Sequence, residues 1–195
     1  MAAWGIPPDN LCFLFAGKLE QKKRVLDLLN ALRLACNAQP HIHLLVVGTG
    51  DLMEQSVQLV GGAGLPVSFA GFLNQSEMPK AYAAADCLVL PSDFGETWGL
   101  VVNEAMVCGL PAIVSDRVGC GPDLVINGVT GAVFPFGDVG QLAQGMVEMA
   151  ADHTRRQSMG ERAQRHVAEY TVEQAVDGTM EAFNAVTVGP AVPET

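Results

Sequence analysis

The sequence predicts a doubly wound α/β domain, in which a parallel sheet of about six strands is covered by helices on both faces. Short apolar or β-branched runs alternate with longer segments whose apolar residues recur at helical spacing. Strands separated by helices need crossover connections, and right-handed crossovers build a parallel sheet. Hydrophobic residues make up 49% of the chain and charged residues 16%, a balance that argues against disorder and predicts a sizeable core.

The elements follow from these patterns in chain order. The predicted strands span 11–17, 42–48, 67–71, 87–91, 111–115 and 131–134. The predicted helices span 22–38, 51–61, 76–85, 99–108, 122–127, 139–151, 154–170 and 172–186. We expect residues 1–10 to be a linker remnant, 11–188 to be the domain and 189–195 to be a loose tail.

Helix starts carry recognisable signals. Ser76 is a plausible N-cap, and Pro79 is tolerated in the first turn of the helix that follows. Asp138 and Thr171 each stand three residues before a glutamine, which is the spacing of a capping box. They predict the starts of two of the three C-terminal helices.

Charge and cysteine content narrow the function classes. The net charge of −10 argues against a nucleic-acid surface, which needs a basic footprint. Apolar runs are too short to span a bilayer and no signal peptide opens the chain, so we expect a cytoplasmic domain with membrane association, if any, through another part of the protein. The five cysteines are odd in number and widely spaced, which favours reduced thiols. Cys120 lies among glycines and is expected to be exposed; a catalytic role for this thiol is a minor alternative.

Ligands of doubly wound, Rossmann-like sheets bind outside the carboxyl ends of the strands, so the loops after the strands are informative. Gly17 ends the first strand, and Lys18 and Lys23 lie on either side of the turn that follows. Four of the eleven basic residues fall within 18–24, which indicates either a small anion or a solvated helix start. After the second strand, Gly48 and Gly50 permit close approach of a ligand or form a plain tight turn. The third glycine of a dinucleotide fingerprint is missing, which argues against a redox cofactor.

The loop after the fourth strand carries the strongest signal. The amides of Trp98, Gly99 and Leu100 open a helix and would form an anion cradle. Glu96 and Glu104 bracket this cradle. Carboxylates there would repel a phosphate but accept hydrogen bonds from sugar hydroxyls, which suits a ligand composed of ribose, diphosphate and sugar. The simpler alternative is a pair of solvated glutamates. A further loop at 118–123, rich in glycine, would shape the wall of the site.

With these residues in view, the chain resembles the C-terminal domain of family 4 retaining glycosyltransferases of the GT-B architecture. Glu96 and Glu104 reproduce the family's motif of two glutamates separated by seven residues. The stretches 84–92, 104–111 and 130–138 match the segments around that motif in the same order. The resemblance covers about residues 11–170.

The resemblance implies roles for these positions. Lys18 and Lys23 would bind the diphosphate and stabilise the leaving nucleoside diphosphate, Glu104 would hold the ribose and Glu96 the donor sugar. The loops around Gly48, Gly50 and Phe72 would flank the nucleobase. A UDP-sugar is the expected donor, with GDP- and ADP-sugars as alternatives. Transfer, typically of a hexose, would retain the anomeric configuration and would need an acceptor held by an N-terminal domain absent from this chain, so the isolated domain is expected to be inactive alone.

Two departures from the family pattern affect donor choice. Position 18 is lysine, where arginine is usual in the family. Lysine lacks the planar guanidinium that can donate two hydrogen bonds to a phosphate. Thr97 and Trp98 replace a glycine and a phenylalanine. The sequence holds no Asp-x-Asp pair, and we predict that no metal ion or cofactor is needed.

Other interpretations stay open. A non-catalytic nucleotide-binding or interaction module on the same fold is the main alternative, whereas a sugar-nucleotide epimerase or a phosphorylase is a minor one. The last predicted helix also carries an apolar stripe, for which core packing is the simpler interpretation. In the resembling family this helix crosses to the other domain, so we expect part of the stripe to be exposed. The stripe comprises Val172, Ala175, Val176, Thr179, Met180, Phe183 and Val186.

Overall fold

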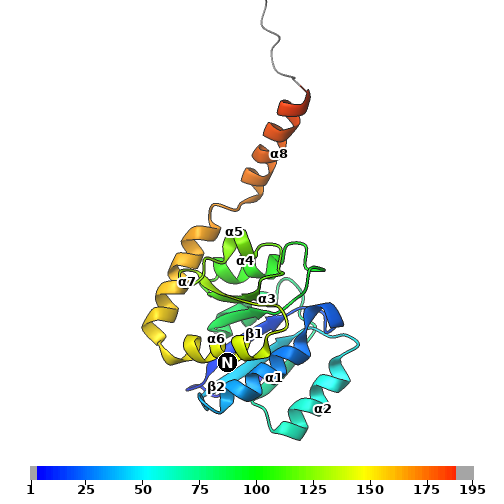
Figure 1. The fold of residues 1–195 in the computed structure, drawn as a ribbon, viewed down its shortest axis with the longest axis vertical. Helices are drawn as coiled ribbons and strands as arrows, with labels where there is room; N and C mark the ends of the chain where they lie inside the picture. Colours follow the sequence, from blue (N-terminus) through cyan, green and yellow to red (C-terminus); the bar gives the residue numbers. More distant parts are fainter. Residues whose placement is uncertain (1–3, 188–195) are drawn as a thin grey trace, which may run out of the picture.

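The computed structural model describes residues 4–187, and a six-stranded parallel sheet lies at its centre (Figure 1). The strands are arranged in the order β3-β2-β1-β4-β5-β6. The predicted doubly wound sheet of six strands is therefore confirmed. The strands are β1 (Leu11–Ala16), β2 (Ile42–Val47), β3 (Val67–Gly71), β4 (Cys87–Leu90), β5 (Ala112–Ser115) and β6 (Gly131–Phe134).

The direction in which strands are added reverses between β1 and β4. β1 pairs with β2 on one side, from Leu11 opposite Ile42 to Ala16 opposite Val47. On its other side it pairs with β4, with Phe13 opposite Cys87. The connections leaving β1 and β4 at this point run to opposite sides, which opens a crevice at the carboxyl edge of the sheet.

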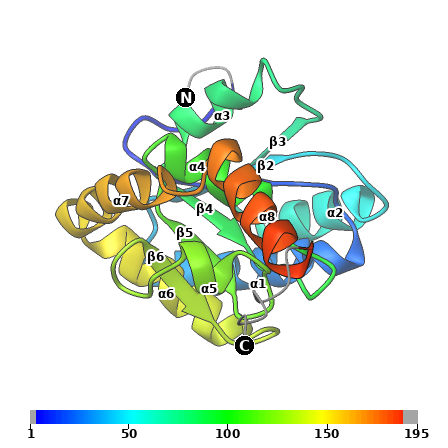
Figure 2. The ribbon, with the colours of Figure 1, turned by 90° about the horizontal axis from the view of Figure 1, so that it is seen from above.

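Helices cover both faces of the sheet, as Figure 2 shows from above. Alternate residues of β1 point to opposite faces: Phe13 and Phe15 are buried with α1 and α6, and Leu14 and Ala16 with α3 and α4. Both faces of the strands are therefore buried, which accounts for their continuous apolar sequence. The helices are α1 (Val25–Cys36), α2 (Met53–Ala63), α3 (Met78–Ala84), α4 (Leu100–Val107), α5 (Gly121–Leu124), α6 (Val139–Ala151), α7 (His153–Val167) and α8 (Val172–Thr187).

The first helix begins later than predicted. Gln21–Lys23 form a 3₁₀ turn, and Arg24 adopts a left-handed conformation with φ of 53° before α1 begins at Val25. Arg24 is the only non-glycine residue with positive φ among residues 4–187. A residue in the left-handed conformation cannot continue an α-helix. The segment 17–23 is therefore not part of α1 and forms the loop after β1.

The cap predicted at Ser76 is wrong, because α3 begins at Met78 and its N-cap position is Glu77. The side chain of Asn74 instead accepts from the amides of Ser76 at 3.0 Å and Glu77 at 3.1 Å, which forms a local turn before the helix. The other two caps are confirmed. Asp138 accepts from the amide of Gln141 at 2.9 Å, and Thr171 from that of Gln174 at 3.2 Å.

The last helix, α8, projects away from the body of the domain (Figure 1). Its apolar side chains are exposed, including Val172 at 77% and Phe183 at 58%. The predicted exposure of this stripe is therefore confirmed. At the other end of the chain, Ile6 of the expected linker is buried in the core. The expected tail, 189–195, lies outside the described residues, and no helix within 4–187 is long and apolar enough to cross a membrane.

Candidate functional site

A cavity of about 630 Å³ lies at the carboxyl edge of β1, β2 and β3. Its volume falls in the range of small-molecule sites, about 300–1,000 Å³. The fold gathers residues here from three loops and two helices, and six of the predicted site residues line this one cavity. They are Gly17, Lys18, Gly48, Gly50, Phe72 and Glu104.

The two glycines after β2 have a packing role that the sequence analysis did not identify. A Cβ at Gly48 would overlap the carbonyl oxygen of Gly17, and one at Gly50 would overlap the backbone of Leu19. The two loops are also joined by a hydrogen bond of 3.0 Å from the amide of Leu19 to the carbonyl of Thr49. Gly48 and Gly50 therefore let the loops after β1 and β2 lie against each other and form the floor of the cavity.

Lys23 and Glu96 form an ion pair beside the cavity. Each side chain is 14% exposed, and the Lys23 side chain lies against Gly17, where an added Cβ would be 3.6 Å from Lys23 Cε. The 3₁₀ turn after β1 carries the lysine and the loop after β4 carries the glutamate. The structure thus pairs a lysine that was predicted to bind the diphosphate with a glutamate that was predicted to bind the sugar. The pair lies at the switch point of the sheet.

The loop from Glu96 to Leu100 is held by the loop after β5. The amide of Gly119 donates to the Glu96 carbonyl at 3.0 Å, and the amide of Cys120 donates to the Trp98 carbonyl at 2.8 Å. Gly99 has φ of 101°, so the turn into α4 requires glycine. Within the described part of the chain, the amides of Trp98, Gly99 and Leu100 donate to no other residue, as an anion cradle at a helix start requires.

The cavity itself is not lined by the other predicted donor-binding residues, which are Thr97, Trp98, Gly99 and Leu100. Thr97 and Leu100 are exposed, Gly99 is buried, and the Trp98 indole donates to Asn103 Oδ1 at 2.8 Å. The predicted cradle therefore lies outside the cavity, in the segment that directly follows Glu96 of the ion pair.

Glu104 has a partner that the sequence analysis missed. The hydroxyl of Tyr82 on α3 donates to Glu104 Oε2 at 2.5 Å. Tyr82 is buried, and burial together with this hydrogen bond to Glu104 raises the pKa of its phenol. One carboxylate oxygen of Glu104 is therefore fixed from behind, while the residue itself is exposed and faces the cavity.

The basic cluster of 18–24 divides between three acidic partners. Lys18 and Lys22 lie 3.7 and 3.4 Å from the carboxylate of Glu20, and Arg24 lies 2.6 Å from Asp27. Lys18 remains 62% exposed at the mouth of the cavity. Its exposed ammonium can therefore move toward an anionic ligand, because such a surface pair contributes little stability.

Comparisons with known proteins agree with this geometry. The model of the family described as glycosyl transferases group 1 matches residues 1–166. The chain belongs to this family. Sulfoquinovosyl transferase SQD2 of Arabidopsis thaliana is 31% identical over 166 residues, which cover 84% of this chain and 31% of that protein. This group 1 glycosyltransferase chain spans less than half the length of the curated relatives that it matches first.

Solved structures share the fold of this group 1 chain. HepE from Anabaena, solved in complex with UDP, has a TM-score of 0.78 at 25% identity and covers 89% of this chain and 49% of that chain. The C-terminal domain of the group 1 protein LpcC from Francisella tularensis has a TM-score of 0.74 at 21% identity and covers 83% of this chain and 87% of that chain. The doubly wound sheet thus matches that of GT-B glycosyltransferases.

Several residues of the cavity wall in this group 1 domain were not predicted, Asn74, Gln75 and Met78 among them. Asn74 and Gln75 come from the segment between β3 and α3, and Met78 is the first residue of α3. Sequence alone placed this segment next to a strand end, but it offered neither a basic cluster nor a glycine-rich turn. The polar tips of Asn74 and Gln75 add hydrogen-bonding groups to an otherwise apolar wall.

The expectation that Cys120 is exposed is wrong. Its side chain is fully buried, and burial raises the pKa of this thiol to about 12. A thiol in this state is a poor nucleophile, which argues against the minor catalytic alternative. All five cysteines are free, as predicted.

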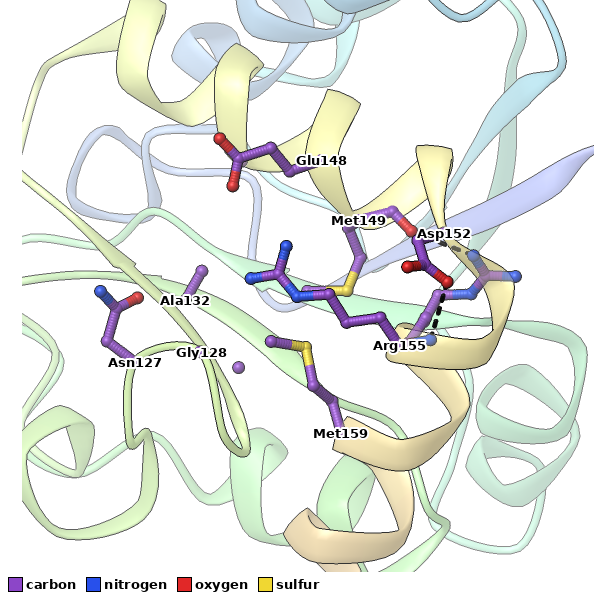
Figure 3. Close-up of a pocket in the computed structure, with 11 residues that line it drawn as sticks. Asn127, Gly128, Ala132, Glu148, Met149, Asp152, Arg155 and Met159 are labelled. Carbon is purple, nitrogen blue, oxygen red and sulfur yellow. Dashed lines mark hydrogen bonds between the residues drawn. The ribbon is translucent and has the colours of Figure 1, made fainter.

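A second cavity of the group 1 domain lies at the opposite, amino edge of the sheet (Figure 3). Its volume is about 120 Å³, which is room for a few water molecules and not for a nucleotide. The side chain of Arg155 extends across it from α7. Its walls, formed by 127–132 and parts of α6 and α7, contain none of the predicted site residues. Among the residues that the structure describes, no three metal-ligating side chains gather into a cluster.

Proposed function

We propose that this chain is the C-terminal, donor-binding domain of a retaining, family 4 glycosyltransferase, and that another part of the enzyme holds the acceptor. The short span of the chain against its relatives supports this division, as does its likeness to the domain of LpcC that is described as C-terminal. The exposed apolar stripe of α8 offers a surface on which a second domain can pack.

We propose a nucleoside-diphosphate sugar, with UDP as the nucleotide, as the ligand of the carboxyl-edge cavity. The observation that carries the proposal is that Lys18 and Glu104 line one cavity together with Gly17, against which Lys23 of the Lys23–Glu96 pair lies. The cavity, the ion pair and the loop before α4 bring cations, hydroxyl acceptors and free amides to the carboxyl edge of the sheet, and these are the groups that a nucleoside diphosphate sugar needs. The presence of UDP in the HepE structure supports this assignment.

Each group then has a task in the proposed reaction. Glu104, held by Tyr82, accepts the ribose hydroxyls, while Gly48, Gly50 and Phe72 flank the base. Lys18, Lys23 and the amides before α4 stabilise the negative charge that grows on the departing diphosphate, without a metal ion. Glu96 accepts hydroxyl groups of the sugar. Because both reactants must be held together, the chain on its own binds donor but transfers sugar poorly.

Calorimetry on this chain tests the proposal. UDP, GDP and ADP are titrated into the wild type, into Glu104→Gln, and into Glu148→Gln as a control at the opposite cavity. We expect UDP to bind, Glu104→Gln to weaken it about tenfold or more, and Glu148→Gln to leave it unchanged, because charge-assisted hydrogen bonds contribute about 1.5–3 kcal/mol. Failure of every nucleotide to bind would favour the alternative of a non-catalytic interaction module.

A further inference from the structure

Two arginines and two aromatic rings form a continuous chain of contacts along the carboxyl edge. The Arg117 guanidinium lies 4.2 Å from the ring centre of Phe94 and 4.8 Å from that of Phe136. Arg24 lies 5.3 Å from the same Phe136 ring. We call Phe94, Arg117, Phe136 and Arg24 the arginine–aromatic chain. These distances lie within the range of cation–π contacts.

The four members come from four different loops. Arg24 follows β1, Phe94 follows β4, Arg117 follows β5 and Phe136 follows β6. The chain of contacts therefore links all the loops on the sugar-binding side of the proposed site. Its two ends adjoin the ion pair: Arg24 is the neighbour of Lys23, and Phe94 precedes Glu96 by two residues.

Backbone hydrogen bonds fix the ends of the Glu96 loop, and within the loop the amides of Glu96 and Gly95 donate to the Asp93 carbonyl at 3.0 Å and to Asp93 Oδ1 at 2.7 Å. The amide of Asp93 donates to the Lys22 carbonyl at 2.9 Å, and the amide of Gly119 donates to the Glu96 carbonyl at 3.0 Å. Between these anchors, Phe94 is 70% exposed. A ring so exposed gains little from burial, so its contact with Arg117 is the interaction that ties the Phe94 side chain to the loop after β5.

Two members of the arginine–aromatic chain, Phe136 and Arg24, are fixed independently. The amide of Phe136 donates to Asp116 Oδ1 at 2.9 Å, and Arg24 is paired with Asp27. Arg117 differs from Arg24, since its guanidinium has no acidic partner among residues 4–187. The aromatic rings are therefore its described side-chain partners, and it is the central link of the chain.

We propose that Arg117 and Phe94 are positioning residues that hold the Glu96 loop in the register in which Glu96 meets Lys23. The proposal rests on the proposed function, because it assigns these residues to the sugar end of the donor site. The left-handed conformation of Arg24 fits this role, as strained backbone persists where surrounding contacts require it. The affinity for the sugar part of the donor should therefore depend on the arginine–aromatic chain, whereas the affinity for the nucleotide part should not.

The test uses the Trp4→Phe variant of the protein as its starting point. In this variant Trp98, two residues after Glu96, is the only tryptophan. Arg117→Gln and Phe94→Leu break the arginine–aromatic chain, whereas Phe94→Tyr keeps the ring. Phe72→Leu is the matched control, since Phe72 is similarly exposed, at 76%, but lines the proposed nucleotide cavity. UDP and UDP-glucose are titrated into each variant by calorimetry, and quenching of Trp98 fluorescence by acrylamide is measured without ligand.

We expect Arg117→Gln and Phe94→Leu to lower the ratio of UDP-glucose affinity to UDP affinity about three- to tenfold, with UDP affinity unchanged. Trp98 quenching should increase in both variants, and Phe94→Tyr should restore both readouts. Phe72→Leu should weaken UDP and UDP-glucose equally. An unchanged ratio together with unchanged quenching in Arg117→Gln would overturn the proposal, as would an equal loss of UDP and UDP-glucose affinity.

Failure of the proposed function gives a different result. If the wild type binds neither UDP nor UDP-glucose, the donor-site assignment is wrong, and Trp98 quenching alone then decides whether Arg117 and Phe94 hold the loop. Unchanged quenching in that case would overturn the positioning proposal as well.

Discussion

The Lys23 ammonium pairs with the Glu96 carboxylate across the switch point of the sheet, 73 residues apart in the chain. Each side chain is largely shielded from water, at 14% exposure, and each neutralises the other. A donor that bound here would place its diphosphate near Lys23 and its sugar near Glu96. The pair therefore sets the direction in which the donor would lie along the sheet edge.

Separating the two charges should affect nucleotide and sugar differently. We expect Glu96→Gln to strengthen UDP binding about threefold or more, because an anion next to the diphosphate is removed, and to abolish any extra affinity for UDP-glucose. Lys23→Gln should weaken both ligands about tenfold or more. Calorimetry measures these affinities, and weaker UDP binding by Glu96→Gln would show that the carboxylate does not face the phosphate.

Tyr82→Phe should loosen Glu104 without unfolding the domain. The variant loses one hydrogen bond of 2.5 Å to a carboxylate and leaves no buried polar group behind. We expect UDP affinity to fall about three- to tenfold and the free energy of unfolding to change by less than about 1.5 kcal/mol. Tyr170→Phe is the control, because that hydroxyl donates to the Asp123 carbonyl at 3.1 Å away from the cavity. Equal UDP affinity in the two variants would count against this support for Glu104.

Two glycines should respond in opposite ways to the same added methyl group. Gly50→Ala places a Cβ on the backbone of Leu19, and we expect the free energy of unfolding to fall by about 1–3 kcal/mol. Gly61→Ala adds a Cβ in open space inside α2, and we expect a gain of about 0.5–1 kcal/mol. Urea unfolding of the two variants measures both. A neutral Gly50→Ala would show that the loops after β1 and β2 can separate.

His43 should make the stability of the domain depend on pH. Burial lowers the pKa of His43 below its ordinary value, and its Nδ1 is buried without a hydrogen-bond partner among the described residues. Because the unfolded chain takes up the proton first, the free energy of unfolding falls as pH decreases through about 6.5, by at most about 1.4 kcal/mol per pH unit.

Urea unfolding at pH 7.5 and 5.5 checks this prediction. The pH dependence should be reduced in His43→Gln and kept in His41→Gln, in which an exposed histidine is replaced. Equal pH dependence in His43→Gln and the wild type would assign the effect to other groups.

The strands and most helices were predictable because their signals are local. Apart from His43, the run 42–47 is apolar on both faces, and the sheet does bury both faces. The spacing of Glu96 and Glu104 also placed one glutamate before α4 and the other inside it. What the sequence could not predict is which loops meet. The Lys23–Glu96 pair depends on β1 lying next to β4, and the contact of Tyr82 with Glu104 depends on α3 lying next to α4.

The errors have the same origin. The glycines around Cys120 suggested an exposed loop, but Gly119 packs against the backbone of Thr97 and brings the cysteine into the core. Serine is a common N-cap residue, but the amide of Ser76 donates to the side chain of Asn74. This hydrogen bond places Ser76 in a turn before the helix. In each case, tertiary packing or a neighbouring side chain decided between local alternatives of similar free energy.

The central claim is that the carboxyl edge of this sheet binds a nucleoside diphosphate. The most direct test is a titration of the isotope-labelled chain with UDP, followed by the NMR shifts of its assigned backbone amides. We predict that the largest shifts occur at Gly17, at Gly48 and Gly50, and at Trp98–Leu100. Shifts gathered instead around Asn127 and Met159 at the opposite edge, or no saturable shifts at all, would contradict the account.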